Sequence, residues 1–141
     1  LHKLMNYGSI FIFTAFNGRK VFNKLKNSDE PYERRVDNKL IYSIKKKYTE
    51  TEFTGINQKI DVLLPFSDGN YYTEYLINDD LLSEELAKKK IILINEDSFD
   101  IYLDKFKENK PHFHKSLTEI DREFISLYSF YIFHKPNKSR R

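Results

Sequence analysis

Two histidines in the last third of the chain have a spacing that suits acid–base or metal chemistry. His112 and His114, in the sequence PHFHK, lie two residues apart. In an extended segment this spacing places both imidazoles on one face, as a metal pair or an acid–base pair requires. A two-histidine metal site needs a further ligand, and Asp100, Asp104 or Glu119 could supply it only if the fold brings one of them close. The alternative is that both histidines are exposed loop residues beside a proline.

The same histidines also suit a metal-independent ribonuclease. One imidazole would take the proton of a 2′-hydroxyl, and Lys115, or Arg122 together with His134, would stabilise the charge on phosphorus. His134 has another interpretation, because it follows an apolar run and a cation is favoured at a helix C-terminus. We predict no catalytic set and no metal site, and keep His112, His114 and Lys115 as the alternative catalytic residues.

Basic and aromatic residues alternate through the first 50 residues, which makes this region a candidate nucleic-acid surface. Cations contact phosphates, and rings stack on the bases of single-stranded nucleic acid. Asp29, Glu33 and Asp37 interrupt the series. The candidate contacts are Arg19, Lys20, Lys24, Lys26, Arg34, Arg35, Lys39, Lys45, Lys46 and Lys47, with Phe22, Tyr32, Tyr42 and Tyr48 as the rings.

The charges are segregated along the chain. Residues 1 to 50 carry 11 Lys/Arg and 5 Asp/Glu, residues 51 to 108 carry 6 and 13, and residues 109 to 141 carry 7 and 3. The blocks form one basic and one acidic face if they map to separate surfaces; alternatively, folding mixes them. The acidic middle would bind a basic protein partner. Its candidate contacts are Asp68, Glu74, Asp79, Asp80, Glu84 and Glu85.

Several reaction classes lack the residues that they need. The chain has no Cys, so thiolate nucleophiles and cysteine-bound metals are excluded, and its 4 Gly are too widely spaced for a phosphate-binding loop or a nucleophile elbow. We expect no cofactor. Tyrosine is abundant and is enriched at protein interfaces. We therefore predict a noncatalytic macromolecule-binding domain, such as an immunity-type or neutralising protein or a phage-type inhibitor. The alternatives are an RNA or single-stranded nucleic-acid binder and a small ribonuclease.

Length and composition favour one domain over residues 1 to 141. A chain of 141 residues buries roughly two-thirds of its unfolded surface, and 12 Phe and 10 Tyr predict an aromatic-rich core. The absence of Cys and of long apolar runs favours a cytoplasmic protein without a membrane span. Met5 is a candidate native start, and residues 136 to 141 read as a frayed basic tail.

The helices and strands that would position these residues are predicted to form an α+β fold with a mixed or mostly antiparallel sheet. We predict a first hairpin over about residues 8 to 25, in which Ile10–Phe16 (IFIFTAF) precedes an Asn17-Gly18 turn and Arg19–Leu25 returns. Because Ile10–Phe16 is apolar on both faces, we place it in the sheet interior, and the return strand at an uncovered edge.

A second hairpin is predicted over residues 59 to 77, with a turn at Asp68-Gly69 and a first strand that either ends at Pro65 or lies at a sheet edge. Residues 29 to 38 are predicted as a helix, and 39 to 47 as a strand. A further short strand at residues 91 to 94 should lie centrally. Helices are expected near 79–89, 98–109 and 117–134, the last opened by a Ser116–Glu119 capping box. Residues 124 to 133 are apolar nearly all round, so a strand is the alternative there.

Overall fold

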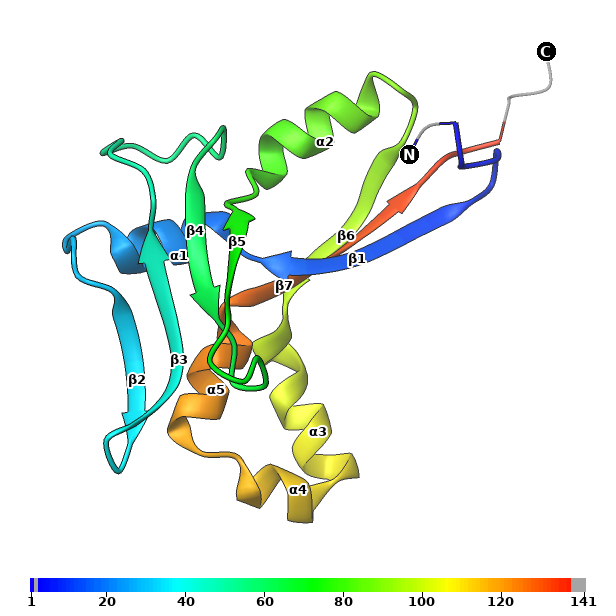
Figure 1. Cartoon of the computed structure of the whole chain (residues 1–141). Coiled ribbons are helices and arrows are strands. Elements are labelled where there is room, and N and C mark those ends of the chain that lie inside the picture. Colours follow the sequence, from blue (N-terminus) through cyan, green and yellow to red (C-terminus); the bar gives the residue numbers. More distant parts are fainter. Residues whose placement is uncertain (2, 138–141) are drawn as a thin grey trace. The chain divides into compact units, whose positions relative to one another are not determined.

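The computed structural model describes Leu1 and residues 3 to 137, and it confirms the predicted α+β class (Figure 1). One sheet has four strands in the order β2-β3-β4-β5, and another has three in the order β1-β7-β6. The chain divides into two compact units. Unit 1 comprises Leu1–Ala15 with Asp79–Arg141, and unit 2 comprises Phe16–Asn78. That the whole chain is one domain stays a prediction.

Unit 2 contains the antiparallel four-stranded sheet and one helix. The elements are α1 (Gly18–Leu25), β2 (Tyr32–Val36), β3 (Lys39–Lys46), β4 (Lys59–Leu63) and β5 (Tyr71–Tyr75). One face of the sheet supplies the core, because Tyr42, Ile44, Ile60 and Val62 share it and are fully buried. On the other face Lys45 and Lys59 are exposed, whereas Ser43 and Leu63 are buried. The sheet therefore has one covered face and one face that carries polar side chains.

The second predicted hairpin is confirmed. Strands β4 and β5 pair antiparallel, and the turn between them contains Asp68 and Gly69 with φ angles of 49° and 82°. Ser67 fixes the turn, since its hydroxyl donates to Leu64 O at 2.9 Å and accepts from Leu64 N at 3.2 Å. Strand β4 ends at Leu63, before Pro65, as expected of a residue that has no N–H to donate.

The first predicted hairpin is wrong. Strand β1 (Ile10–Phe16) forms, but the chain then enters helix α1, and Asn17 is its N-cap, with Oδ1 accepting from Lys20 N at 3.0 Å. The buried residues Gly18, Val21, Phe22 and Leu25 have the spacing of a helical stripe, so burial on one helix face outweighs the turn preference of Asn-Gly. The uncovered strand edge predicted at Arg19–Leu25 therefore does not exist.

Residues 29 to 38 do not form the predicted helix, whereas the strand predicted at 39–47 is confirmed as β3. Strand β2 pairs with β3 as a tight hairpin. The turn residues Asp37 and Asn38 have φ angles of 47° and 65°, the left-handed values of a type I′ turn. Tyr32 and Arg34 then lie opposite Ile44 and Tyr42 on the covered face.

Unit 1 contains the three-stranded sheet and the remaining helices. The strands are β1, β6 (Ile92–Ser98) and β7 (Tyr128–His134). The helices are α2 (Asp79–Ala87), η1 (Phe99–Tyr102), α3 (Leu103–Asn109), α4 (Pro111–Ser116) and α5 (Glu119–Ser126). Helix α2 confirms the prediction at 79–89, and η1 with α3 confirms a helical segment at 98–109. The predicted tail at 136–141 lies outside the described residues from 138 onward.

The continuous helix predicted over 117–134 is wrong in its second half. Helix α5 ends at Ser126, and Tyr128–His134 is the central strand β7. Thr118 with Asp121 forms the capping box, in place of the predicted Ser116–Glu119 pair. Because β7 occupies the centre, β1 and β6 lie at the two edges, so neither apolar run predicted to be central is central here.

The core of unit 1 is aromatic, as predicted. Met5, Ile91, Tyr131 and Phe133 form its buried cluster, and helix α2 covers one face of the sheet through Leu82 and Leu86. The Phe13 and Tyr131 rings stack with their centroids 4.8 Å apart.

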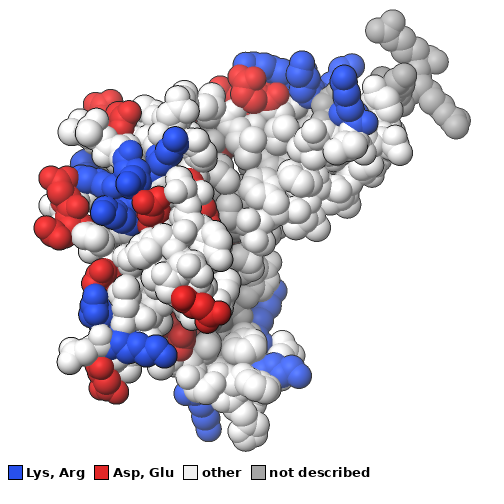
Figure 2. All heavy atoms as spheres, in the orientation of Figure 1, with Lys and Arg blue, Asp and Glu red and all other residues white. Residues whose placement is uncertain are grey.

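The opposite face of this sheet leaves isoleucines exposed. The exposed fractions are 61% for Ile10, 61% for Ile12, 50% for Ile92 and 56% for Ile94. Figure 2 shows a mostly uncharged surface in the region of β1. We call these four residues the isoleucine face.

Candidate nucleic-acid interface

Three lysines and two tyrosines share the polar face of the four-stranded sheet, and we call them the lysine–tyrosine face: Lys45, Lys47, Lys59, Tyr71 and Tyr75. The register arranges them in rows across the strands. Lys47 N donates to Lys59 O at 2.9 Å, and Lys59 lies opposite Tyr75. All five side chains are exposed, with 47% of Tyr71 and 55% of Tyr75 accessible.

The next row across the sheet is Lys45–Asp61–Thr73, and it holds an acidic residue among the lysines. Thr73 Oγ1 donates to Asp61 Oδ1 at 2.7 Å, and Lys47 Nζ lies 3.5 Å from Asp61 Oδ2. The hydrogen bond from Thr73 lowers the pKa of Asp61, and the charges of Lys47 and Lys45 lower it further. Asp61 therefore stays ionised and offsets part of the positive charge of the face.

Further basic candidates surround Tyr32, beside helix α1. Lys24 Nζ donates to the Tyr32 hydroxyl at 3.0 Å and lies 4.4 Å from the ring centroid, while Arg34 Cζ lies 4.6 Å from the same centroid. Arg19 makes the corresponding contact with Phe53 at 5.0 Å. These cations already lie against rings of the protein itself, so the rings are not open platforms for a base.

The rings predicted to stack on bases are mostly core residues. Phe22, Tyr42 and Tyr48 are buried, and Phe22 stacks on Tyr48 with ring centroids 5.7 Å apart. The exposed rings Tyr71 and Tyr75 were missed, although the alternation of the second hairpin placed them on one face. Lys59 was missed as well, since only its pairing with β3 brings it beside Lys45 and Lys47.

The remaining basic candidates are divided by the sheet. Lys46 points to the face opposite its neighbours and pairs with Asp29 at 2.7 Å, and Arg35 pairs with Glu33 at 2.7 Å. Lys20 lies on α1 and is exposed. The predicted basic patch is therefore not one surface: only Lys45 and Lys47 of the ten basic candidates belong to the lysine–tyrosine face.

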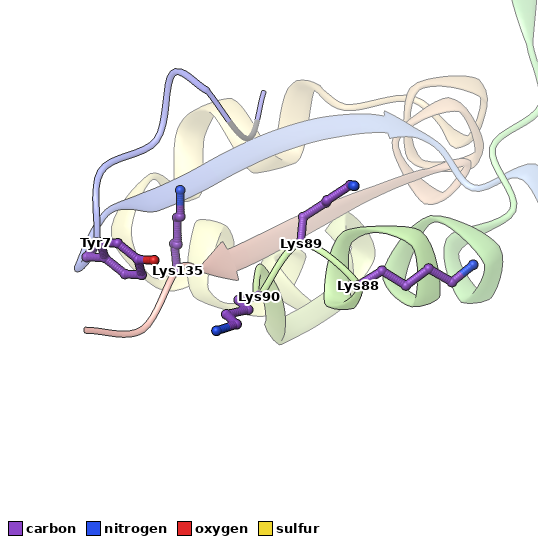
Figure 3. Close-up of a pocket in the computed structure, with 5 residues that line it drawn as sticks. All are labelled: Tyr7, Lys88, Lys89, Lys90 and Lys135. Atoms are coloured by element: carbon purple, nitrogen blue, oxygen red, sulfur yellow. The ribbon is translucent and has the colours of Figure 1, made fainter. Parts of the chain in front are cut away.

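Unit 1 has a separate basic pocket of about 160 Å³, lined by Tyr7, Lys88, Lys89, Lys90 and Lys135 (Figure 3). The ammonium group of Lys135 is buried, donates to Met5 O at 2.7 Å and lies 5.2 Å from the Tyr7 ring centroid. Figure 3 shows that the side chains of Lys88, Lys89 and Lys90 point in different directions. They do not converge on one point, as a cradle for a single phosphate would require.

The imidazoles of His112 and His114 do not face each other. Both lie on the short helix α4, where residues two apart point to different sides, rather than in an extended segment. His112 is exposed. The described residues contain no group of three or more histidine or acidic side chains arranged to hold a metal ion.

His114 does contact one of its predicted partners. Arg122 Nη1 lies 2.9 Å from His114 Nε2, and Arg122 Nη2 donates to His114 O at 3.0 Å. Burial lowers the pKa of His114, and the positive charge of Arg122 lowers it further. A guanidinium only donates, so the imidazole is held as a neutral acceptor. His134 belongs to strand β7 and does not cap a helix, which corrects that prediction.

The six acidic candidates are divided between the two units. Asp68 lies in the exposed hairpin turn, and Glu74 lies on β5 opposite Ile60, where burial raises the pKa of its carboxyl group. The other four lie on α2, with Asp79 and Asp80 in its first turn. Glu85 of that helix pairs with Lys88, and Glu84 is exposed.

One carboxyl group of unit 1, that of Glu96, has a strongly raised pKa. Burial raises the pKa of Glu96 to about 7, with further contributions from a hydrogen bond to Asp79 and from its charge. Glu96 lies opposite Tyr131, whose pKa is raised mainly by burial and then by the charges of Asp79 and Glu96. This arrangement can hold a proton near neutral pH.

Comparison with known proteins gives long viral relatives. The chain is 32% identical over 133 residues to the mRNA-capping enzyme of African swine fever virus (isolate Tick/South Africa/Pretoriuskop Pr4/1996), covering 92% of this chain and 15% of that protein. It is 28% identical over 131 residues to the probable mRNA-capping enzyme of Acanthamoeba polyphaga mimivirus, covering 89% and 11%. No protein-family model matches.

These relatives overturn the predicted function. The proteins that the chain resembles are named as capping enzymes, so the prediction of a noncatalytic immunity-type or phage-type inhibitor is wrong. Of the two predicted partners, a protein and a nucleic acid, the relatives' name is compatible with nucleic acid. The protein partner stays a prediction. Within the described residues, no helix has the length and apolar character needed to cross a bilayer.

Proposed function

We propose that this chain is an RNA-contacting part of an mRNA-capping enzyme. The observation that carries the proposal is the similarity over 92% of the chain to a protein with that name. Since the chain spans only 15% of that relative, the proposal assigns RNA contact to these residues and no bond-making step.

The surface chemistry supports this proposal. Unit 2 exposes lysines beside open tyrosine rings, a combination suited to phosphates and unstacked bases. Unit 1 adds the basic pocket at Lys88, Lys89 and Lys90. A polyanion can contact several lysines whose ammonium groups do not converge, whereas a single small anion cannot.

The isoleucine face fits a chain that functions within a longer polypeptide. Ile10, Ile12, Ile92 and Ile94 are each at least half exposed, and contiguous apolar patches on soluble proteins mark contacts with other protein surfaces. Further sequence of a capping enzyme would cover this face, which leaves the polar surfaces for RNA.

The test is equilibrium binding of a labelled single-stranded RNA to the 141-residue chain by fluorescence anisotropy. If three lysines contact phosphates, the slope of log K against log salt should be about −2, which is an affinity loss of roughly 20-fold between about 50 and 200 mM salt. A labelled polyglutamate of equal charge serves as the control polyanion. Absence of RNA binding at the lower salt, or equally tight polyglutamate binding, would contradict the proposal.

A further inference from the structure

We propose that the lysine–tyrosine face binds single-stranded RNA, with bases stacked on Tyr71 and Tyr75 and phosphates held by Lys45, Lys47 and Lys59. The inference rests on the proposed function and deepens it, because it names the surface and the form of nucleic acid. Neither the relatives' names nor the sequence pattern of the first 50 residues assigns this face.

An unfavourable charge pair lies within the sheet. Lys47 and Lys59 lie directly opposite each other on neighbouring strands, where like charges are destabilising. Their side chains lean apart, with Lys47 Nζ 3.5 Å from Asp61 and Lys59 Nζ 5.4 Å from the Tyr75 ring centroid. Lys47, Lys59 and Asp61 together carry one net positive charge, which one phosphate above the two strands would balance.

The two tyrosine rings lie on the same face of strand β5. Tyr71 and Tyr75 are four residues apart on one strand, so they share a face and lie about 13 Å from each other along β5. Strand β5 is at the edge of the sheet, and about half of each side chain is accessible. Each ring therefore keeps open surface for a base. Tyr75 lies opposite Lys59, whereas Tyr71 lies opposite the buried Leu63, so the lysines belong to the Tyr75 end of the face.

The other basic regions have fewer open rings. Two cations cover the ring of Tyr32, with Lys24 Nζ 4.4 Å and Arg34 Cζ 4.6 Å from its centroid, whereas Tyr75 has one cation at 5.4 Å. The pocket in Figure 3 has one ring, Tyr7, and Lys135 already lies against it. Only the lysine–tyrosine face, within the described residues, joins exposed rings of one strand to a row of lysines. Open rings favour unpaired bases over a duplex, whose bases are stacked on one another.

Ring variants test the stacking. Loss of one stacked base weakens binding by about 5-fold or more, so Tyr71→Ala/Tyr75→Ala should weaken RNA binding by at least about 25-fold. Tyr71→Phe/Tyr75→Phe keeps the rings and should bind like the unmodified chain. Tyr72→Ala is the matched control, because Tyr72 is 51% exposed on the same strand but points to the opposite face.

Charge variants test the phosphate contacts. Lys45→Gln/Lys59→Gln should reduce the magnitude of the salt slope by about 1.4, and Lys39→Gln, at the far end of β3, should leave it unchanged. Asp61→Asn should raise the affinity because it removes the negative charge between the lysines. Asp68→Asn makes the same charge change in the exposed turn and should not. Circular dichroism of each variant verifies folding.

The outcomes separate this inference from the proposed function. RNA binding that is as strong in the Tyr71→Ala/Tyr75→Ala variant as in Tyr72→Ala would overturn the stacking face and leave the proposed function standing. Equal affinity for duplex and single-stranded RNA would overturn the assignment of the single strand. Absence of any RNA binding by the unmodified chain would overturn both.

Discussion

Replacing Glu96 by glutamine should remove a pH dependence of stability from unit 1. Glu96 lies on β6 opposite Tyr131, within hydrogen-bonding reach of Asp79 at the start of α2. Burial raises the pKa of Glu96 from 4.5 to about 7, and Asp79, then Asp80 and Asp97, add repulsion against a second negative charge. The folded chain therefore holds a proton at a site that an unfolded chain would release near pH 4.5.

The magnitude follows from this difference in pKa. A rise from 4.5 to about 7 corresponds to at most about 3.4 kcal/mol, at roughly 1.36 kcal/mol per pH unit. Because the Glu96 carboxyl is partly exposed, solvent screening reduces this, and we expect about 1 kcal/mol. The pKa is raised on folding, so the contribution is complete below pH 4.5 and is lost as the pH rises through about 7.

Urea unfolding followed by circular dichroism, at about pH 5 and about pH 8, measures the effect. The unmodified chain should lose about 1 kcal/mol between these pH values, whereas Glu96→Gln, which stays neutral, should lose little and be the more stable at the higher pH. Glu84→Gln makes the same change at an exposed position of α2 and should keep the pH dependence. An unchanged pH dependence in Glu96→Gln would refute the reasoning.

Two further substitutions test the structure. Gly18→Ala should destabilise the chain by about 1 to 3 kcal/mol, because the new Cβ would lie 2.1 Å from Ile77 O; thermal unfolding measures this, and a stabilised variant, as alanine usually gives in a helix, would contradict the close approach. Ile10→Ser/Ile12→Ser should change the free energy of unfolding by less than about 1 kcal/mol while reducing binding of an apolar dye. Phe11→Ser, on the covered face of β1, is its destabilising control, and equal destabilisation by both would contradict an open isoleucine face.

Elements whose signals are local could be predicted from the sequence. The second hairpin has Asp68-Gly69 between two alternating segments, and α2 begins with Asp79 and Asp80, which suit a helix N-terminus. In each case the residues that specify the element lie within it. The prediction therefore did not depend on which distant segment packs against it.

Asn17-Gly18 shows why local signals were insufficient elsewhere. Asn-Gly is favoured in a hairpin turn, and asparagine is equally favoured as a helix N-cap. The choice depends on burial of the following residues, and the helical spacing of Val21, Phe22 and Leu25 was the signal available. Glycine is favoured at position 18 for a further reason that no local pattern shows, because the backbone of Ile77 leaves no room for a Cβ atom there.

The candidate site was predictable only in part, because it depends on strand register. Lys45 and Lys47 were identified from the basic run, but Lys59 joins them only through the pairing of β3 with β4 across the segment 47–58. Tyr71 and Tyr75 were assigned to a strand, yet their role depends on β5 being an edge. A one-residue change of register would move either set of side chains to the other face.

Strand β1 was predicted to lie in the sheet interior but lies at an edge, and the proposed function offers a reason. Ile10–Phe16 is apolar on both faces, which is typical of a strand covered on both sides, yet β1 lies at an edge with Ile10 and Ile12 exposed. An apolar strand with exposed isoleucines is explained if further polypeptide packs on the isoleucine face. The viral relatives contain such further polypeptide, since they are several times longer than the matched segment. We therefore expect amide hydrogens of β1 to exchange rapidly in the 141-residue chain and slowly when that chain is joined to the longer polypeptide that the proposed function implies. Equal exchange in the two settings would show that the exposed isoleucines are an ordinary feature of the surface.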